Sequence, residues 1–152
     1  MLRIAIALAV AALAWTAVLP AQAASMEQME RNKKNVIAFY DAAINQKDFE
    51  KAKVYFGAMY KQHNPVAADG PEGLKGFIAF LKDKFPNAKS EFKRVFADGD
   101  FVIVHVHAVR EPGTRGVAII DIFRLDENGK VVEHWDVAQP IPEKSANNNT
   151  MF

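Results

Sequence analysis

The sequence predicts an α+β domain in which helices come first and an antiparallel sheet follows. Apolar residues recur at helical spacing through the first half of the chain, whereas apolar and polar residues alternate from Ala88 onward. Short runs rich in Gly, Asp, Asn and Pro separate the alternating segments, as in strands joined by turns. Helices followed by consecutive strands favour a sheet with helices packed on one face.

Three helices are predicted in the first half of the chain. Residues 25–46 place apolar side chains on one broad helical face, and a shorter helix over residues 48–55 begins at an aspartate that can serve as its N-cap. Pro71 opens a third helix, which ends before Pro86. Residues 60–64, between the second and third helices, form a short extended segment.

Four strands are predicted in the second half, over residues 90–97, 101–110, 117–125 and 130–138. An Asp-Gly pair, a Glu-Pro-Gly-Thr run and a Glu-Asn-Gly run join them in turn. Each connection is short, so consecutive strands are expected to pair as antiparallel neighbours.

Both ends of the chain are predicted to lie outside the domain. Residues 1–23 have the features of a cleaved signal peptide, in which Arg3 precedes an apolar run and an Ala-Gln-Ala pattern ends it. A membrane anchor is the alternative, but the apolar run of about 16 residues is shorter than the ~20 that span a bilayer. We therefore expect a periplasmic or secreted protein with one domain over residues 24–142 and a polar, flexible tail over residues 143–152.

Composition excludes several classes of function. Removal of Arg3 with the signal peptide would leave 18 basic residues against 18 acidic ones, so nucleic acid and anionic membranes are not expected partners. The chain has no cysteine, which excludes thiol nucleophiles, disulfides and cysteine zinc sites. No glycine-rich phosphate loop follows a strand, so no organic cofactor is expected.

Five ionisable residues interrupt the apolar strands. Burying such groups without partners costs on the order of 1–3 kcal/mol each, so they form either a self-satisfied polar network or the lining of a pocket. They are His105, His107, Asp121, His134 and Asp136.

Alternation along the strands suggests where these residues point. His105 and His107 share one face of their strand, and the opposite face is fully apolar. A turn centred near residues 113–114 would place Asp121 across from one of the two histidines on the same face. A contact between histidine and aspartate across the strands is therefore expected.

The last strand allows two registers. A two-residue turn at Asn128-Gly129 pairs Asp121 with Asp136 and turns His134 toward the shared face. A three-residue turn with Gly129 in a left-handed conformation shifts the register by one residue and turns Trp135 toward that face instead.

Four stretches of the mature chain resemble the nuclear-transport-factor-2-like superfamily, and within it the SnoaL-like group related to polyketide cyclases. They are Phe39-Tyr40-Asp41-Ala42 with Lys47-Asp48, Gln62-His63-Asn64-Pro65, Asp121-Ile122-Phe123-Arg124, and residues 129–136. The resemblance implies a cone-shaped, curved antiparallel β-sheet packed against three N-terminal helices, the cystatin-like α+β barrel, around a pocket.

The same resemblance implies a homodimer formed through the outer face of the sheet. The apolar side chains Val102, Val104 and Val106 are the expected contact surface for the second subunit.

Ketosteroid isomerase belongs to the same superfamily. Tyr40 and Asp121 resemble the tyrosine and the protonated aspartate of its oxyanion hole, whereas Asn64 stands where its general base would be. Asparagine cannot take up a proton, so the base must be another group. The resemblance to polyketide cyclases makes Asp121 the acid/base group and turns His134 and Asp136, rather than Trp135, toward the pocket.

Together these observations predict a small enzyme that binds a compact hydrophobic carbonyl compound. The expected catalytic residues are Asp121, His107, His105 and His63, and the expected substrate-binding residues are Tyr40, Asn64, His134, Asp136 and Trp135. Proton transfer next to the carbonyl would support aldol-type cyclisation, isomerisation or lyase chemistry. The alternatives are a non-catalytic binding module of the same fold and a metal site at the two strand histidines.

Overall fold

The computed structural model describes residues 25–152, so the signal peptide expected over residues 1–23 lies outside the described part of the chain. A five-stranded sheet with the strand order β1-β5-β4-β3-β2 curls around the helices. The helices are α1 (Met26–Tyr40), α2 (Phe49–Ala52) and α3 (Gly70–Lys84). The strands are β1 (Phe56–Gln62), β2 (Lys89–Asp98), β3 (Phe101–Val109), β4 (Val117–Leu125) and β5 (Val131–Pro140).

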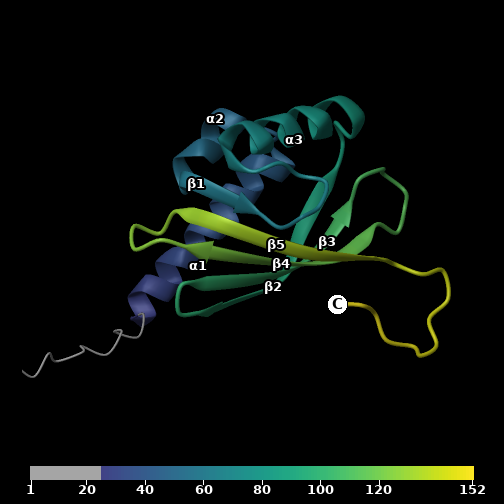
Figure 1. The fold of residues 1–152 in the computed structure, drawn as a ribbon. Coiled ribbons are helices and arrows are strands. Elements are labelled where there is room, and N and C mark those ends of the chain that lie inside the picture. Colours follow the sequence, from purple (N-terminus) through teal and green to yellow (C-terminus); the bar gives the residue numbers. More distant parts are fainter. Residues whose placement is uncertain (1–24) are drawn as a thin grey trace, which may run out of the picture.

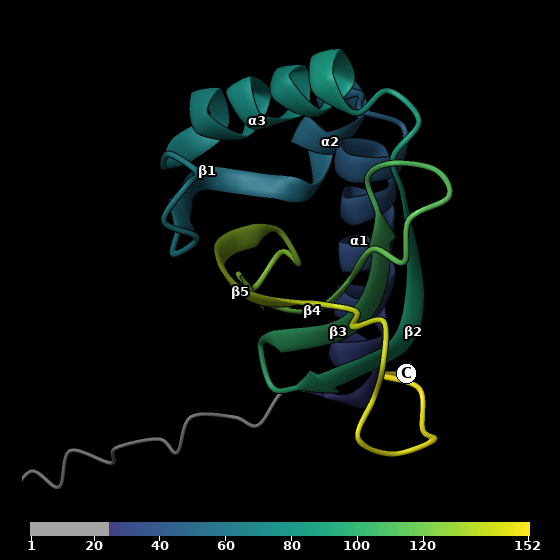
Figure 2. The ribbon, with the colours of Figure 1, turned by 90° about the vertical axis from the view of Figure 1, so that its right-hand side faces the viewer.

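The predicted α+β architecture is confirmed. Strands β2 to β5 form the antiparallel meander, and α1 lies against the concave side of the sheet while α3 covers β1 at one end (Figures 1 and 2). Residues 60–62 of the segment expected to be extended at residues 60–64 belong to β1, which pairs in parallel with β5 and closes one edge of the cone. Among residues 25–152, no helix is long and apolar enough to cross a membrane.

The first helix changes its winding before it ends. After Tyr40 the chain continues as a π-helix, Asp41–Asn45, where a single α-helix was expected. The side-chain amide of Asn45 then pairs with the backbone of Ser90, accepting from its N–H at 2.8 Å and donating to its carbonyl at 3.1 Å. The π-helix, a feature often found at functional sites, is thereby fixed to the first residues of β2.

The inner face of β3 forms the core, and this corrects an expectation. Val102, Val104 and Val106 are fully buried. They pack with the aromatic cluster around Phe39, whose ring contacts Phe123 edge to face at 6.0 Å. The apolar face of β3 that was expected to contact a second subunit thus packs against the helices of its own chain. Folding of the single chain already removes this face from water.

The same register corrects the expected position of the strand histidines. Asp121 pairs with Val104, so it shares the inner face of the sheet. His105 pairs with Ile120, and His107 pairs with Ala118, so both histidines point to the outer face. The expectation that Asp121 shares a face with the two histidines is wrong.

The β4–β5 connection combines features of both registers that the sequence allowed. Gly129 is left-handed with φ 74°, and its N–H donates to the carbonyl of Asp126 at 2.9 Å. This turn pairs Leu125 with Val131, but the register shifts before Arg124 pairs with Glu133. Val132 is therefore an extra residue in β5, a β-bulge that brings Asp136 opposite Asp121.

Helix α1 holds this turn in place. The Asn35 side chain donates to the carbonyl of Gly129 at 2.8 Å, and Arg31 donates to the carbonyl of Glu127 at 2.9 Å. A Cβ atom at position 129 would lie 2.8 Å from the Asn35 amide nitrogen. Any side chain here meets both an unfavourable backbone conformation and the clamp from α1.

The C-terminal segment turns back along the outer face of the sheet (Figure 2). The Phe152 ring lies 4.8 Å from the His107 ring and 5.2 Å from the His105 ring. The Lys93 ammonium lies 5.4 Å from the Phe152 ring centroid. The last residue therefore covers the two outer-face histidines.

We expect Gly129→Ala to lower the free energy of unfolding by about 2–3 kcal/mol, because alanine is strained at positive φ and would displace the Asn35 amide. Urea denaturation of both proteins measures the change. Gly76→Ala is the matched control, because a Cβ atom at this position in α3 meets no other atom and alanine favours the helix. Equal stability of Gly129→Ala and the unsubstituted protein would contradict the role of the turn.

Candidate active site

A cavity of about 140 Å³ lies between the concave face of the sheet and the helices. Its walls are mainly apolar, and polar groups from β1, β4 and β5 meet on one side. A dry cavity of similar size can hold a molecule the size of benzene. The apolar wall includes Phe39, Ala43, Ile44, Leu74, Phe77 and Phe123.

Three ionisable side chains meet in the cavity wall. Asp121 from β4 lies beside His134 and Asp136 from β5, and ligand-type atoms of all three lie within 4.8 Å of one another. His134 Nε2 lies 3.1 Å from Asp121 Oδ1 and 3.9 Å from Asp136 Oδ2. Asp121 is 5 % exposed, and its second oxygen, Oδ2, has no hydrogen-bond partner in the described part of the chain.

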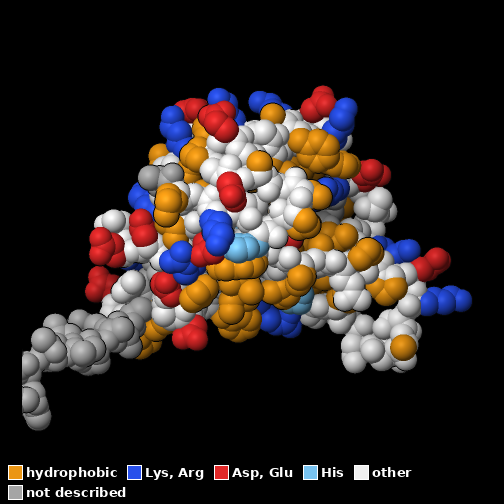
Figure 3. All heavy atoms as spheres, viewed as in Figure 1, with side chains coloured by type: hydrophobic (Ala, Val, Ile, Leu, Met, Phe, Trp, Pro, Cys, Tyr) orange, Lys and Arg blue, Asp and Glu red, His pale blue; other side chains and the backbone are white. Residues whose placement is uncertain are grey.

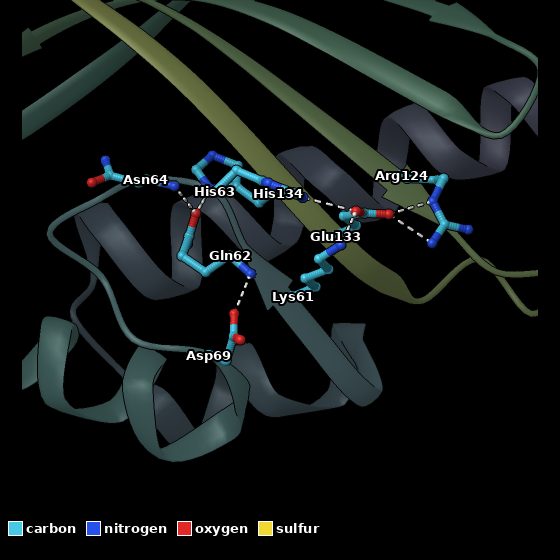
Figure 4. Close-up of polar contacts among 8 residues, drawn as sticks. All are labelled: Lys61, Gln62, His63, Asn64, Asp69, Arg124, Glu133 and His134. Carbon is cyan, nitrogen blue, oxygen red and sulfur yellow. Dashed lines mark hydrogen bonds and ion pairs between the residues drawn. The ribbon is translucent and has the colours of Figure 1, made fainter.

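Gln62 fixes the orientation of His134 (Figure 4). The backbone N–H of Asn64 donates to Gln62 Oε1 at 2.9 Å, so this atom must be an acceptor. His134 Nδ1 lies 2.8 Å from the same oxygen and therefore carries its proton. Nε2 is thus the nitrogen left to share a proton with Asp121.

The remaining contact therefore has two proton arrangements. Either Asp121 is a neutral acid that donates to a neutral His134, or a carboxylate accepts from an imidazolium. Burial raises the pKa of Asp121 and outweighs the opposing effect of His134, which lowers it. Burial therefore favours the neutral acid in the empty cavity.

Two tyrosines supply neutral hydrogen-bond donors to the same cavity. Burial raises the pKa of both Tyr40 and Tyr60. The Tyr60 hydroxyl accepts from Gln62 Nε2 at 3.3 Å, which leaves its own proton free for another acceptor. Both hydroxyls thus stay protonated and available to a bound carbonyl oxygen.

Asn64 holds Asp136 at the edge of this cluster. Its side-chain nitrogen donates to Asp136 Oδ2 at 2.6 Å, while its side-chain oxygen accepts from the backbone N–H of Val66 at 2.9 Å. The second contact fixes which end of the amide faces Asp136. Asn64 therefore fixes the position of the Asp136 carboxylate at the edge of the cavity.

The structure brings five of the sequence-predicted site residues to the cavity and leaves four outside it. Those in the cavity wall are Tyr40, Asn64, Asp121, His134 and Asp136. Those outside are His63, His105, His107 and Trp135.

His63 and Trp135 lie on the far side of their strands from the cavity. Their rings stack with centroids 4.6 Å apart. His63 Nε2 contacts Glu133 Oε1 at 2.8 Å, and Arg124 donates to the other oxygen of this carboxylate (Figure 4). The His63 contact, with help from Arg124, lowers the pKa of Glu133. His63, which was expected to be catalytic, therefore lies outside the cavity wall.

His105 and His107 also engage partners away from the cavity. His105 Nδ1 lies 3.0 Å from an Arg94 guanidinium nitrogen, and His107 Nε2 lies 2.8 Å from the carbonyl of Arg115. In the described part of the chain, the side chains close enough to hold a metal ion together are Asp121, His134 and Asp136 rather than this pair. The metal alternative at His105 and His107 thus has no third ligand among residues 25–152.

Tyr60, Gln62 and Arg110 are among the polar cavity residues that the sequence reasoning missed. Alternation could have found the first two, because Tyr60, Gln62 and Asn64 must share one face of an extended segment and His63 must take the other.

Comparison with known proteins places the chain in a family. A model of the SnoaL-like domain matches residues 36–134. The chain belongs to the SnoaL-like family. No curated protein matches it.

Several solved structures share the fold of this SnoaL-like protein. A candidate polyketide cyclase from Bacillus cereus superposes with a TM-score of 0.65 at 20% identity, over 76% of this chain and 78% of that one. A SnoaL-like protein of unknown function from Burkholderia thailandensis gives 0.62 at 13% identity, over 76% and 98%. A candidate isomerase of the SnoaL-like family from Agrobacterium tumefaciens gives 0.60 at 15% identity, over 75% and 99%. At these identities the likeness shows the fold alone.

The raised pKa of Asp121 predicts how stability depends on pH. A carboxyl that is neutral when folded and ionised when unfolded stabilises the fold below its ordinary pKa of 3.8, and this contribution is lost as pH rises through the folded-state pKa. Within that window, the stability of the unsubstituted protein relative to Asp121→Asn should fall by about 1.4 kcal/mol per pH unit.

Urea denaturation of both proteins at a series of pH values measures this difference. Asp83→Asn, at an exposed position of α3, is the control and should show no such slope. A stability difference between the protein and Asp121→Asn that rises with pH would show that the carboxylate form is favoured instead.

Proposed function

We propose that this SnoaL-like protein is an acid/base enzyme that transfers a proton at the carbon next to the carbonyl of a compact hydrophobic compound. The observation that supports this proposal most directly concerns Asp121. Its Oδ1 contacts His134 Nε2, and its Oδ2 has no hydrogen-bond partner in the described part of the chain. An unpartnered buried oxygen costs free energy, and such sites are commonly functional. The chemistry would be cyclisation or isomerisation.

In the proposed step, Asp121 and His134 act together as the base. The Asp121 proton moves from Oδ1 to His134 Nε2, Oδ2 takes the proton from the substrate carbon, and the C–H electron pair passes to the carbonyl oxygen as an enolate. Tyr40 or Tyr60 donates a hydrogen bond to that oxygen, since both remain neutral. Return of the proton from Asp121 to another carbon gives isomerisation. Attack of the enolate on a second carbonyl forms the new C–C bond, and the resulting alkoxide takes the proton from Asp121 to give the cyclised product.

The pKa of Asp121 suits this role. A raised pKa makes its carboxylate a stronger base than an exposed aspartate. The neighbouring imidazole of His134 can hold the proton that leaves Asp121 during the transfer. Its positive charge balances the carboxylate, so no counterion has to enter the apolar cavity. The names of the B. cereus and A. tumefaciens proteins, candidate cyclase and candidate isomerase, are consistent with chemistry of this kind.

A non-catalytic binding module is the second candidate. Its support is that Gln62, Asn64 and Asp136 already satisfy one another through hydrogen bonds, as in a rigid binding site. Such a module would bind the same class of compound without turnover, so one set of variants separates the two functions.

Two further features of the proposal concern the setting of the protein. Residues 1–23 would direct export to the periplasm or medium, which N-terminal sequencing of the mature protein tests. A homodimer could form through the outer sheet face, where hydrophobic side chains gather in the view of Figure 3 and Phe96 and Val137 are exposed. Sedimentation of the mature protein measures this association.

Proton transfer can be detected without knowing the substrate. We expect the protein to speed hydrogen–deuterium exchange next to the carbonyl in a panel of cyclic ketones and diketones, followed by NMR in D₂O. Asp121→Asn should slow this exchange by about 10²–10⁴-fold because it removes the proton acceptor. His105→Ala is the control, because this histidine lies outside the cavity and should leave the rate unchanged.

The outcome decides between the two candidates. Exchange that Asp121→Asn leaves intact would remove the proposed base. Saturable ketone binding without exchange by the unsubstituted protein would establish the binding module instead.

Gln62 offers a test of the proton arrangement. Gln62→Glu should move the lower limb of the exchange-rate pH profile to lower pH, because a carboxylate beside His134 Nδ1 favours imidazolium and hence an ionised Asp121. Gln62→Leu, which cannot fix the tautomer, should slow exchange about 10–100-fold. Gln139→Leu, at the exposed end of β5, is the control. An unshifted pH profile in Gln62→Glu would show that Gln62 only fills space.

A further inference from the structure

The cavity has a cationic rim that the proposed proton transfer does not use. Arg110 lines the cavity and follows directly after β3, two residues beyond Ala108, whose side chain points inward. Its guanidinium carbon lies 5.5 Å from the centroid of the Phe85 ring, at the end of α3. An aromatic face under a guanidinium holds it in position without neutralising its charge.

Arg110 differs from the other arginines of the described chain. Arg31, Arg94, Arg115 and Arg124 each contact a carbonyl, histidine or carboxylate partner within hydrogen-bond distance. In residues 25–152, no such partner and no carboxylate within ion-pair distance is found for Arg110. Its donors are therefore available to a ligand.

The charge of Arg110 reaches into the cavity. It lowers the pKa of the buried Tyr40 hydroxyl, opposing the larger effect of burial. The carboxyl groups of Asp121 and Asp136 lie farther along the sheet. Asp121 on β4 pairs with Val104 on β3, and Asp136 on β5 pairs with Asp121. One end of the cavity is thus acidic and the other is basic.

We propose that Arg110 binds the carboxylate of the substrate, and that the substrate is an oxo acid whose ketone lies several bonds from its carboxylate. Arginine matches a carboxylate with two parallel hydrogen bonds, and such pairs are strong where the surroundings are partly apolar. Arg110 lies six positions after Val104 along the extended chain, roughly 20 Å, and the side chains of Arg110 and Asp121 shorten the distance that a ligand has to span. The assignment of the ketone end rests on the proposed function, whereas carboxylate binding does not.

A matched pair of probes tests the proposal. The compounds are 7-oxooctanoate and its primary amide, which share shape and ketone and differ in charge. We expect the protein to bind the carboxylate about tenfold more tightly than the amide by titration calorimetry. Arg110→Gln should abolish this preference, and Arg110→Lys should keep part of it because the charge remains.

Two controls make the result specific. Arg94→Gln, on the outer face, should keep the full preference. Asp121→Asn should also keep it while losing exchange next to the ketone, so failure of the proton transfer and failure of carboxylate binding are told apart. If Arg110→Gln does not fold, the test uses Arg110→Lys. This variant should still prefer the carboxylate, and it should lose that preference in high salt.

Three results would overturn the proposal. They are equal affinity of the unsubstituted protein for both probes, a preference that survives Arg110→Gln, and no saturable binding of the carboxylate at millimolar concentration.

Discussion

The single extra residue in β5, Val132, sets the chemistry of the cavity. The Gly129 turn alone would place Trp135 opposite Asp121, and the bulge moves the register by one residue so that His134 and Asp136 face inward. A strand has a side-chain period of two, so this one residue exchanges an apolar ring for an imidazole and a carboxylate. The clamp from α1 onto the turn and the Arg124–Glu133 pair beyond the bulge hold the register from both sides.

The polar groups of the cavity are held by contacts that each determine the next. Asp69 accepts from the Gln62 backbone at 2.7 Å, the Asn64 backbone fixes the Gln62 oxygen, and that oxygen fixes the His134 tautomer. This sequence of contacts ends at Asp121, whose Oδ2 is the one buried side-chain atom of the cluster without a hydrogen-bond partner in the described chain. The hydrogen bonds of such a site orient its side chains and leave one acceptor oxygen free. This arrangement is preorganised to take a proton from a ligand.

The sequence predicted most of the fold and about half of the site, for identifiable reasons. Periodicity locates helices and strands well, and the family resemblance placed Asp121, Tyr40 and Asn64 correctly in the cavity wall. The error at His105 and His107 came from assigning the apolar face of β3 to a partner, although an apolar strand face covered by helices is sufficient as a core. The bulge at Val132 depends on how the turn, α1 and β1 fit together in space, and no local residue pattern shows it.

The opposite charges at the two ends of the cavity also bear on how Asp121 works. An uncompensated carboxylate in the apolar cavity would raise the pKa of Asp121 further and keep it protonated. A carboxylate paired with Arg110 forms an ion pair without net charge, so Asp121 can still ionise when the proposed substrate is bound. On this reasoning the cationic rim would serve the proposed proton transfer indirectly, because a charged molecule could enter without disabling the proposed base at the far end.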